Sequence, residues 1–252
     1  MCTLSIVCGG SDGFTVVMNR DEEQSRLAAL APTVHELGGG AGIRATWPTD
    51  QDAGGTWVAT ASGHGGSVGT GLVLCLMNGN PTARPARPED VVSRGTIIPK
   101  VIGTNPPDAW AVLSRVREMA LHRFAPFRLV GLSRQEFAGK GDKPSRVDCK
   151  LVSFVWSGQR AFEEILDARK ARCFVSSGLG DELVAVRMPL FAETVGGAAS
   201  EARGAAQRAF HRHQWPERTN VSVMMVREGA RTVSITTCTL DERGAVMAYE
   251  PV

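Results

Sequence analysis

Hydrophobic and polar positions along the chain form β-rich runs that are separated by two regions with helix signals. Short runs rich in Val, Ile, Thr and Phe, bounded by Gly, Pro, Asn or Asp, predict strands. Prolines followed by an acidic residue, as at Pro88 and Pro107, predict helix starts. The expected strands are 2–8, 14–18, 56–61, 69–77, 127–132, 147–156, 160–166, 173–176, 221–226, 232–240 and 245–250. The expected helices are 88–99, 106–121, 183–195 with a break at Pro189, and 198–211.

The order of these elements predicts the fold class. Strands, helices, strands, helices and strands again are typical of two sheets with a helix layer outside each, so we expect an α+β fold arranged as a four-layer αββα sandwich. Segment 69–77 is apolar on both faces and therefore predicts a central strand. The sequence contains no internal repeat or clear linker, which favours a single domain over residues 1–252.

Residues 19–53 are polar, Gly-rich and aperiodic, and they predict a long loop with only short regular pieces. Loops of this length in a compact domain usually carry a function. The glycine-rich stretch 38–42 follows no clear strand and has no Lys-Ser or Lys-Thr pair, so it does not indicate a phosphate-binding loop.

Composition narrows the class of protein without identifying it. The chain has 252 residues, of which 43% are hydrophobic and 21% charged, and these values are typical of a soluble globular protein. The formal net charge of +2 is too small to predict a nucleic-acid-binding surface. The N-terminus lacks the pattern of a signal peptide, and no run of 18 apolar residues predicts a membrane span, so we expect a cytoplasmic protein.

The six cysteines are scattered without CxxC spacing and several lie in apolar runs, which indicates reduced thiols rather than disulfides or zinc ligands. His211 and His213 form an HxH pair near a helix end, where alternate residues point apart. No metal and no cofactor is therefore expected.

Cys2 is the first candidate for chemistry. A small second residue permits removal of Met1, which would leave a free α-amine on a residue that carries a thiol. The reference pKa values are about 8 for the amine and about 8.5 for the thiol, so the amine can act as the base for its own side chain. The alternative is that Cys2 is merely the second residue of an apolar strand.

The tetrapeptide Asn19-Arg20-Asp21-Glu22 follows the first predicted hairpin and so lies across it from Cys2. A carboxylate at Asp21 can hold the α-amine, and a guanidinium at Arg20 can lower the pKa of the thiol. The alternative is an ordinary polar loop after a strand.

Several motifs in order carry a resemblance to a known family: MCT at the N-terminus, this NRDE tetrapeptide, GGTW at 54–57, Asn78, Ser93-Arg94-Gly95 and ARTVS at 230–234. Together they resemble the NRDE family, also called the transport and Golgi organisation 2 family. That family is in turn similar to the penicillin V acylase and bile salt hydrolase branch of the N-terminal-nucleophile hydrolases. The resemblance implies their fold and spans nearly the whole chain.

The resemblance also implies roles for individual residues. Cys2 would be the nucleophile, Asp21 the carboxylate near its amine and Arg20 a neighbour, although the acylase branch places its arginine slightly earlier. Asn78 would donate to the oxyanion, or it is simply part of the turn Asn78-Gly79-Asn80. Arg187 would be a second arginine at the nucleophile, or a surface residue. The expected substrate-binding residues are Asn19, Trp57 and Ser177, with Trp57 equally able to fill the core.

Two functions remain open from the sequence. The first is an amide hydrolase that forms an acyl-enzyme on Cys2 and acts on a small-molecule amide, with a homo-oligomer as an open alternative to a monomer. The second is a non-catalytic binding or trafficking protein of the same family, for example in haem handling or secretory-pathway organisation. The chain departs from the family by reading Met224-Met225-Val226-Arg227 where a Cys-Met-His-Arg run is common, so a role that rests on that His is absent and the substrate need not carry over.

Overall fold

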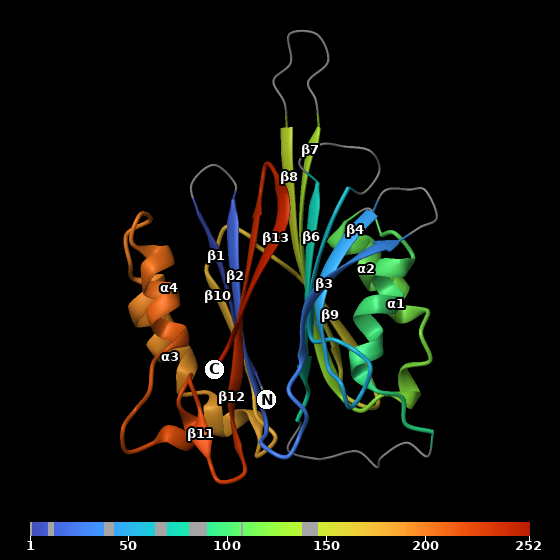
Figure 1. The fold of residues 1–252 in the computed structure, drawn as a ribbon. Coiled ribbons are helices and arrows are strands. Elements are labelled where there is room, and N and C mark those ends of the chain that lie inside the picture. The colour runs from blue at the N-terminus through green and yellow to red at the C-terminus, as the bar shows by residue number, and fades with distance from the viewer. Residues whose placement is uncertain are drawn as a thin grey trace.

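A computed structural model describes residues 2–9, 13–37, 43–63, 70–80, 90–106, 108–137 and 146–252. Two antiparallel sheets face each other, and a layer of helices covers the outer face of each sheet (Figure 1). The structure therefore confirms the expected α+β fold and its four-layer αββα arrangement.

The first sheet contains the N-terminal strand in its interior. Within the described residues it has six strands, in the order β10-β1-β2-β12-β11, with β13 also paired to β12. Their bounds are β1 (Cys2–Cys8), β2 (Phe14–Glu23), β10 (Arg172–Ser176), β11 (Val226–Arg227), β12 (Ala230–Asp241) and β13 (Gly244–Pro251). Strand β1 thus lies inside the sheet, between β2, which follows it in sequence, and β10 from far along the chain.

The second sheet is a continuous antiparallel meander. Over the described ranges it has seven strands in sequence order, from β3 to β9. Their bounds are β3 (Leu30–Leu37), β4 (Ile43–Thr49), β5 (Val58–Ser62), β6 (Gly71–Asn78), β7 (Phe127–Phe137), β8 (Arg146–Trp156) and β9 (Ala161–Leu166). Strand β6 is central and apolar on both faces, as expected from its sequence.

The helices are short and form the two outer layers. Helices α1 (Ile97–Gly103) and α2 (Ala109–Arg117) pack on the second sheet, while α3 (Arg187–Phe191) and α4 (Arg203–His211) pack on the first (Figure 1). Asp108 caps α2 by accepting hydrogen bonds from the backbone N–H groups of Trp110 and Ala111, each at 2.9 Å. No helix in the described part of the chain is long and apolar enough to cross a bilayer.

Three hydrophobic clusters hold the four layers together. One lies between the second sheet and α1 and α2, one between the two sheets, and a smaller one between the first sheet and α3 and α4. The middle cluster includes Cys2, Met18, Trp57 and Cys75. Cys2 is therefore built into the interface between the sheets.

The prediction of a long loop over residues 19–53 is wrong. Strand β2 continues through the NRDE tetrapeptide to Glu23, and β3 and β4 occupy half of the remainder. The polar residues of this segment lack the period of an exposed strand because Asn19, Arg20 and Asp21 are all buried. Their partners come from distant parts of the chain, so the local pattern does not reveal the strand.

The expected helix at 88–99 is also corrected. Residues 81–89 lie outside the described residues, and the described segment begins its helical course with a 3-10 turn at Arg94–Thr96 that leads into α1. Pro99 does not end a helix, since it occupies the first turn of α1, where a missing N–H costs no hydrogen bond.

The helical region expected at 183–195 is made of three pieces: a 3-10 turn at Asp181–Val184, α3, and a π-helical turn at Ala192–Gly196. Pro189 lies within the first turn of α3 and does not split it. Helix α4 begins at Arg203 rather than at 198.

The strand expected at 221–226 is wrong as well. The segment forms a 3-10 turn at Thr219–Val221 and reaches extended pairing only at β11. Apolar residues at every second position, Val221, Val223 and Met225, imitate a strand in the sequence, but Ser222 between them is buried as well. The carbonyl groups of Val221 and Val223 accept hydrogen bonds from the side chains of Arg187 and Asn19, and not from a neighbouring strand.

Candidate active site

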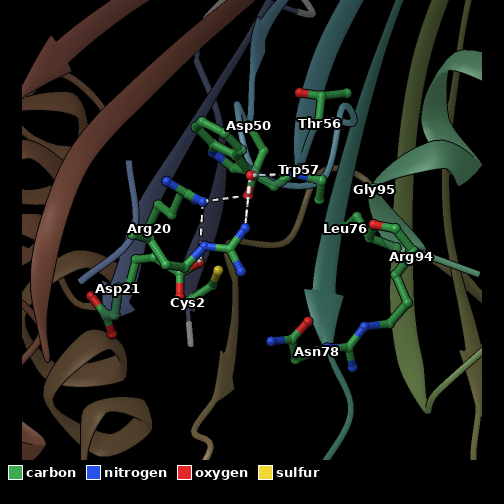
Figure 2. A pocket seen from close by; sticks show the side chains of 14 residues that line it. Cys2, Arg20, Asp21, Asp50, Thr56, Trp57, Leu76, Asn78, Arg94 and Gly95 are labelled. Carbon is green, nitrogen blue, oxygen red and sulfur yellow. Dashed lines mark hydrogen bonds and ion pairs between the residues drawn. The ribbon is translucent and has the colours of Figure 1, made fainter. Parts of the chain in front are cut away.

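Cys2 lies at the start of β1, with paired strands on both sides. Cys2 pairs with Arg20 of β2 and with Ser176 of β10. Directly opposed residues of an antiparallel pair project to the same face, so Cys2 and Arg20 both face the second sheet. The Cys2 side chain is 6% exposed and lies in the wall of a pocket between the sheets (Figure 2).

This pocket, which we call the Cys2 pocket, opens at one end of the sandwich. Its cavity volume is about 180 Å³, which is below the usual range of about 300 to 1,000 Å³ for small-molecule sites and leaves room for only a small reacting group. Strands β1, β2 and β6 and the loops before β5 and α1 contribute its walls. The lining residues are Cys2, Arg20, Asp21, Glu22, Arg26, Asp50, Ala53, Thr56, Trp57, Leu76, Asn78, Ser93, Arg94 and Gly95.

Arg20 is held in the wall of the Cys2 pocket by charge and by an aromatic ring. One guanidinium nitrogen lies 2.7 Å from Asp50 Oδ2 and 3.1 Å from Glu22 Oε2. The guanidinium carbon lies 4.3 Å from the ring centre of Trp57, within the range of a cation–π contact. Trp57 therefore lines the pocket and supports Arg20 at the same time.

Asp50 organises the loop beside the pocket. Its Oδ1 accepts hydrogen bonds from the backbone N–H groups of Asp52 and Ala53, at 3.0 and 3.1 Å, and both carboxylate oxygens bind Arg26. Burial raises the pKa of Asp50, but the Ala53 hydrogen bond and the two arginines outweigh it and lower the pKa overall. The sequence interpretation did not single out Asp50, whose only local signal is its place at the end of β4.

Asp21 follows Arg20 in the strand and faces the opposite way, toward α3 and α4. Its Oδ1 accepts a hydrogen bond of 2.6 Å from Thr232 Oγ1, and its Oδ2 lies 3.6 Å from a guanidinium nitrogen of Arg187. Burial raises the pKa of Asp21, and the positive charge of Arg187 opposes that change. Because successive side chains of a strand point to opposite faces, Arg20 faces the second sheet while Asp21 faces the helix layer.

Arg187 is fully buried, at 0% exposure, and is no surface residue. It donates to Thr3 Oγ1 at 2.6 Å and to the carbonyl oxygen of Val221 at 3.0 Å, in addition to its ion pair with Asp21. It does not line the Cys2 pocket, so it reaches Cys2 by the charge of its guanidinium and by its contacts with Asp21 and Thr3.

The environment of Cys2 favours a neutral thiol at rest. Burial raises the pKa of the Cys2 thiol, the negative charge of Asp21 acts in the same direction, and the positive charge of Arg20 opposes both. A thiol of this kind needs a base at the moment of reaction.

Asn78 is at the end of β6, across the Cys2 pocket from β1 (Figure 2). The structure has no turn at Gly79 and Asn80. The N–H of Gly79 binds the carbonyl oxygen of Pro126, which continues the pairing of Asn78 with Phe127. Asn78 therefore ends a strand and lines the pocket.

Asn19 lies away from the pocket, and its placement gives no support to a role in substrate binding. Its Nδ2 donates to the carbonyl oxygens of His211 and Val223, and its Oδ1 is 2.6 Å from His211 Nδ1. His211 Nε2 is 2.6 Å from Ser5 Oγ. Because Asn19 Oδ1 can only accept, His211 carries its proton on Nδ1 and accepts from Ser5. This Ser-His-Asn chain resembles a catalytic triad, but all three residues are fully buried.

Ser177 is also absent from the lining of the Cys2 pocket. Its N–H donates to Asp181 Oδ1 at 2.8 Å, and its hydroxyl accepts from the N–H of Leu179. These contacts shape the turn after β10 and give no support to contact with a substrate.

Arg94 is a pocket residue that the sequence interpretation quoted within a motif but did not assign to the site. It precedes α1 and donates to the carbonyl oxygen of Pro126 at 2.8 Å. Burial lowers its pKa, and negative charge at Cys2 and Glu22 opposes that change. Elsewhere in the described ranges, no three His, Cys, Asp or Glu side chains are grouped as a metal site requires.

The fold resembles that of the N-terminal-nucleophile hydrolases. A solved structure with this arrangement is the Caenorhabditis elegans N-acylethanolamine-hydrolyzing acid amidase ortholog, with a TM-score of 0.51 and 13% sequence identity. The alignment covers 94% of this chain and 92% of that chain. At this identity the likeness shows the fold alone.

The family follows from the sequence. The family model described as Transport and Golgi organisation 2 matches residues 1–154, more than half of the chain, and the protein belongs to that family. A search of curated proteins gave no match.

Proposed function

We propose that this protein is an amide hydrolase whose nucleophile is the thiol of Cys2, freed by removal of Met1. Met1 itself lies outside the described residues. The observation that carries the proposal is that Cys2, Arg20 and Asn78 line one pocket between the two sheets. A thiol, a cation and a neutral amide donor are the groups that acyl transfer requires.

In the proposed reaction the Cys2 sulfur forms a bond to the amide carbonyl carbon while the α-amine of the same residue accepts the thiol proton. Asn78 donates to the oxygen that becomes negative, which is worth about 3 to 4 kcal/mol in such sites. The α-amine then protonates the leaving nitrogen as the C–N bond breaks, which leaves a thioester on Cys2. Water attacks the thioester, releases the acid and restores the thiol.

Asp21 and Arg187 have a positioning role in this scheme. The fully buried pair ties β2 to α3, and Arg187 also holds Thr3, the residue after the nucleophile. A negative charge on Asp21 next to the start of β1 favours a protonated α-amine after the thiol has lost its proton. Arg20 lies beside the sulfur and stabilises the thiolate that forms transiently.

A second hollow supports an apolar acyl group. It shares Asn78 with the Cys2 pocket, includes Ser176, the strand neighbour of Cys2, and has a cavity volume of about 360 Å³. Much of its wall is apolar, with contributions from Met77, Phe127, Val155, Phe174 and Met188. Apolar surface of this kind gains free energy when it covers hydrocarbon.

The test is acylation of the protein by a β-lactone probe, read by intact mass and peptide mapping. We expect a protein mass without Met1 and one adduct on Cys2, and no adduct in Cys2→Ala. Cys8→Ala, which removes another thiol of β1, should label like the unmodified sequence. Full labelling of Cys2→Ala would defeat the proposal.

The rival function is a binding protein of the same family without turnover. The observation in its favour is that Cys2 is almost buried and that burial raises the pKa of its thiol. A retained Met1 would block the α-amine. Intact mass therefore separates the two functions, since a binder can keep Met1 and a hydrolase of this type cannot.

A further inference from the structure

We propose that Arg94 binds a carboxylate of the ligand, so that the substrate of the Cys2 pocket is an amide that also carries an acidic group. The inference takes the location of the site from the proposed function, but binding of an acid at Arg94 does not require turnover. Arg94 then contacts substrate and determines specificity.

The first reason is the state of the Arg94 guanidinium. In the described part of the structure its hydrogen bond goes to the carbonyl oxygen of Pro126, and no carboxylate lies within ion-pair distance of it. A guanidinium has five N–H donors, so most of them remain for another partner. The side chain is half-buried in the pocket wall, where a cation without a counter-ion is costly.

The other two arginines of the Cys2 pocket are different. Arg20 binds Asp50 and Glu22, and Arg26 binds Asp50 and lies 3.3 Å from Asp52. Their positive charges are neutralised by the protein itself. Arg94 is thus the lining arginine that is left for a ligand, among the residues that the structure describes.

The third reason is that the fold holds Arg94 firmly in place. The N–H of Thr56 donates to the carbonyl oxygen of Gly95 at 2.9 Å, and this contact ties the segment of Arg94 to the segment of Trp57. The bond to Pro126 fixes the guanidinium from the other side. A preorganised guanidinium of this kind suits the two oxygens of a carboxylate.

The charges around the pocket favour a singly charged group. Glu22 and Asp50 also line it, and their carboxylates would repel a dianion more strongly than a monoanion. Arg94 faces Asn78 and Cys2 across the same space (Figure 2), so a ligand can have its amide at Cys2 and its acid at Arg94.

The experiment compares acids with their matched carboxamides. N-hexanoylglycine, N-hexanoylleucine and N-hexanoylglutamate are titrated by calorimetry into Cys2→Ala, which cannot turn them over, alongside the three compounds with the carboxylates amidated. We expect at least one acid to bind 10-fold to 100-fold more tightly than its carboxamide. The preference should fall below 3-fold when Arg94→Gln is added.

Two further variants make the result specific. Arg123→Gln removes an exposed arginine from the turn near Pro126 and should keep the full preference. Arg94→Lys keeps the positive charge but loses the paired N–H donors of the guanidinium, so it should keep part of the preference for acids. Thermal unfolding checks that each variant is folded. Equal binding of acids and carboxamides, absence of binding by every acid, or a preference that survives Arg94→Gln would each overturn the inference.

Turnover of the same compounds by the unmodified sequence separates this inference from the proposed function. Hydrolysis of acids and carboxamides at equal rates would leave the hydrolase in place and overturn the role of Arg94. Tighter binding of acids without any hydrolysis would support the role of Arg94 and count against the hydrolase.

Discussion

The backbones of Gly55 and Gly95 touch: a β-carbon built on Gly55 would lie 2.4 Å from the carbonyl carbon of Gly95. No side chain fits in that space, and the contact joins the loop before β5 to the start of α1. Through it, the two segments that carry Trp57 and Arg94 are fixed on either side of the Cys2 pocket.

Gly55→Ala should therefore destabilise the protein and disturb the pocket. Forcing a methyl group against a backbone costs about 1 to 3 kcal/mol. Urea unfolding measures the loss, and the rate of Cys2 acylation by the β-lactone should fall with it. Gly103→Ala is the matched control, because a β-carbon there meets no atom within 4 Å and the residue is the last of α1. Equal stability of the two variants would contradict the close contact.

Asp50→Asn tests the charge that holds Arg20. Asparagine can keep the turn, because its Oδ1 can still accept the backbone hydrogen bonds. The guanidinium of Arg20, which is almost buried, would lose its closest carboxylate. We expect a loss of about 2 to 4 kcal/mol in the free energy of unfolding, since Asp50 is only 15% exposed. Asp52→Asn, with its carboxylate 35% exposed, should cost less than about 1 kcal/mol. Similar losses for the two variants would show that Asp50 does not hold Arg20 by charge.

Asn78→Ala tests the oxyanion donor by comparing two reactions of the same thiol. Acylation by a β-lactone passes through a tetrahedral oxyanion, and its rate should fall about 100-fold to 1,000-fold. Alkylation by iodoacetamide forms no oxyanion and should keep its rate. Asn80→Ala, whose side chain binds Asp181 and does not line the Cys2 pocket, should affect neither reaction. A parallel loss in both reactions of Asn78→Ala would indicate a structural role only.

His211 should make the protein sensitive to acid. Burial lowers its pKa from 6.5 to about 3, with contributions from the charges of Arg187 and Arg212. Between these pH values His211 is therefore protonated in the unfolded chain and neutral in the folded chain. The contribution of His211 to stability is complete above pH 6.5 and is lost as the pH falls toward 3.

Between pH 7 and pH 5 this loss amounts to about 2 kcal/mol. It is measured by urea unfolding at several pH values in the unmodified sequence and in His211→Gln, which cannot titrate there. The variant should be less stable at pH 7 and should lose less on acidification. Parallel curves for the two proteins would mean that folding does not change the pKa of His211.

The sequence predicts the fold well where burial follows a local period. The hairpin from Cys2 to Met18 and the apolar strand β6 are recognisable because their side chains pack against whole sheets, which selects β-branched and apolar residues along the run. The order of strands and helices then leaves few arrangements other than two covered sheets.

The same reasoning fails at the NRDE tetrapeptide, because its burial depends on partners that are remote in sequence. Asn19 is buried against His211, Arg20 against Asp50 and Trp57, and Asp21 against Thr232 and Arg187. A polar strand of this kind has the composition of a loop. Arg94 was missed for a similar reason, since contacts with residues remote in sequence, between Gly95 and Gly55 and between Arg94 and Pro126, bring it to the pocket.

The order of the strands also fixes when the proposed α-amine can be made. Strand β1 lies between β2 and β10, and β10 leaves the ribosome about 170 residues after Cys2. At 5 to 20 residues per second this is roughly 10 to 30 seconds, in which the N-terminus is still open to an aminopeptidase. Once β10 has paired, β1 has a neighbouring strand on each side and Cys2 is almost buried. If Cys2 is the nucleophile, as proposed, we expect Met1 to be removed during translation, before β10 pairs with β1.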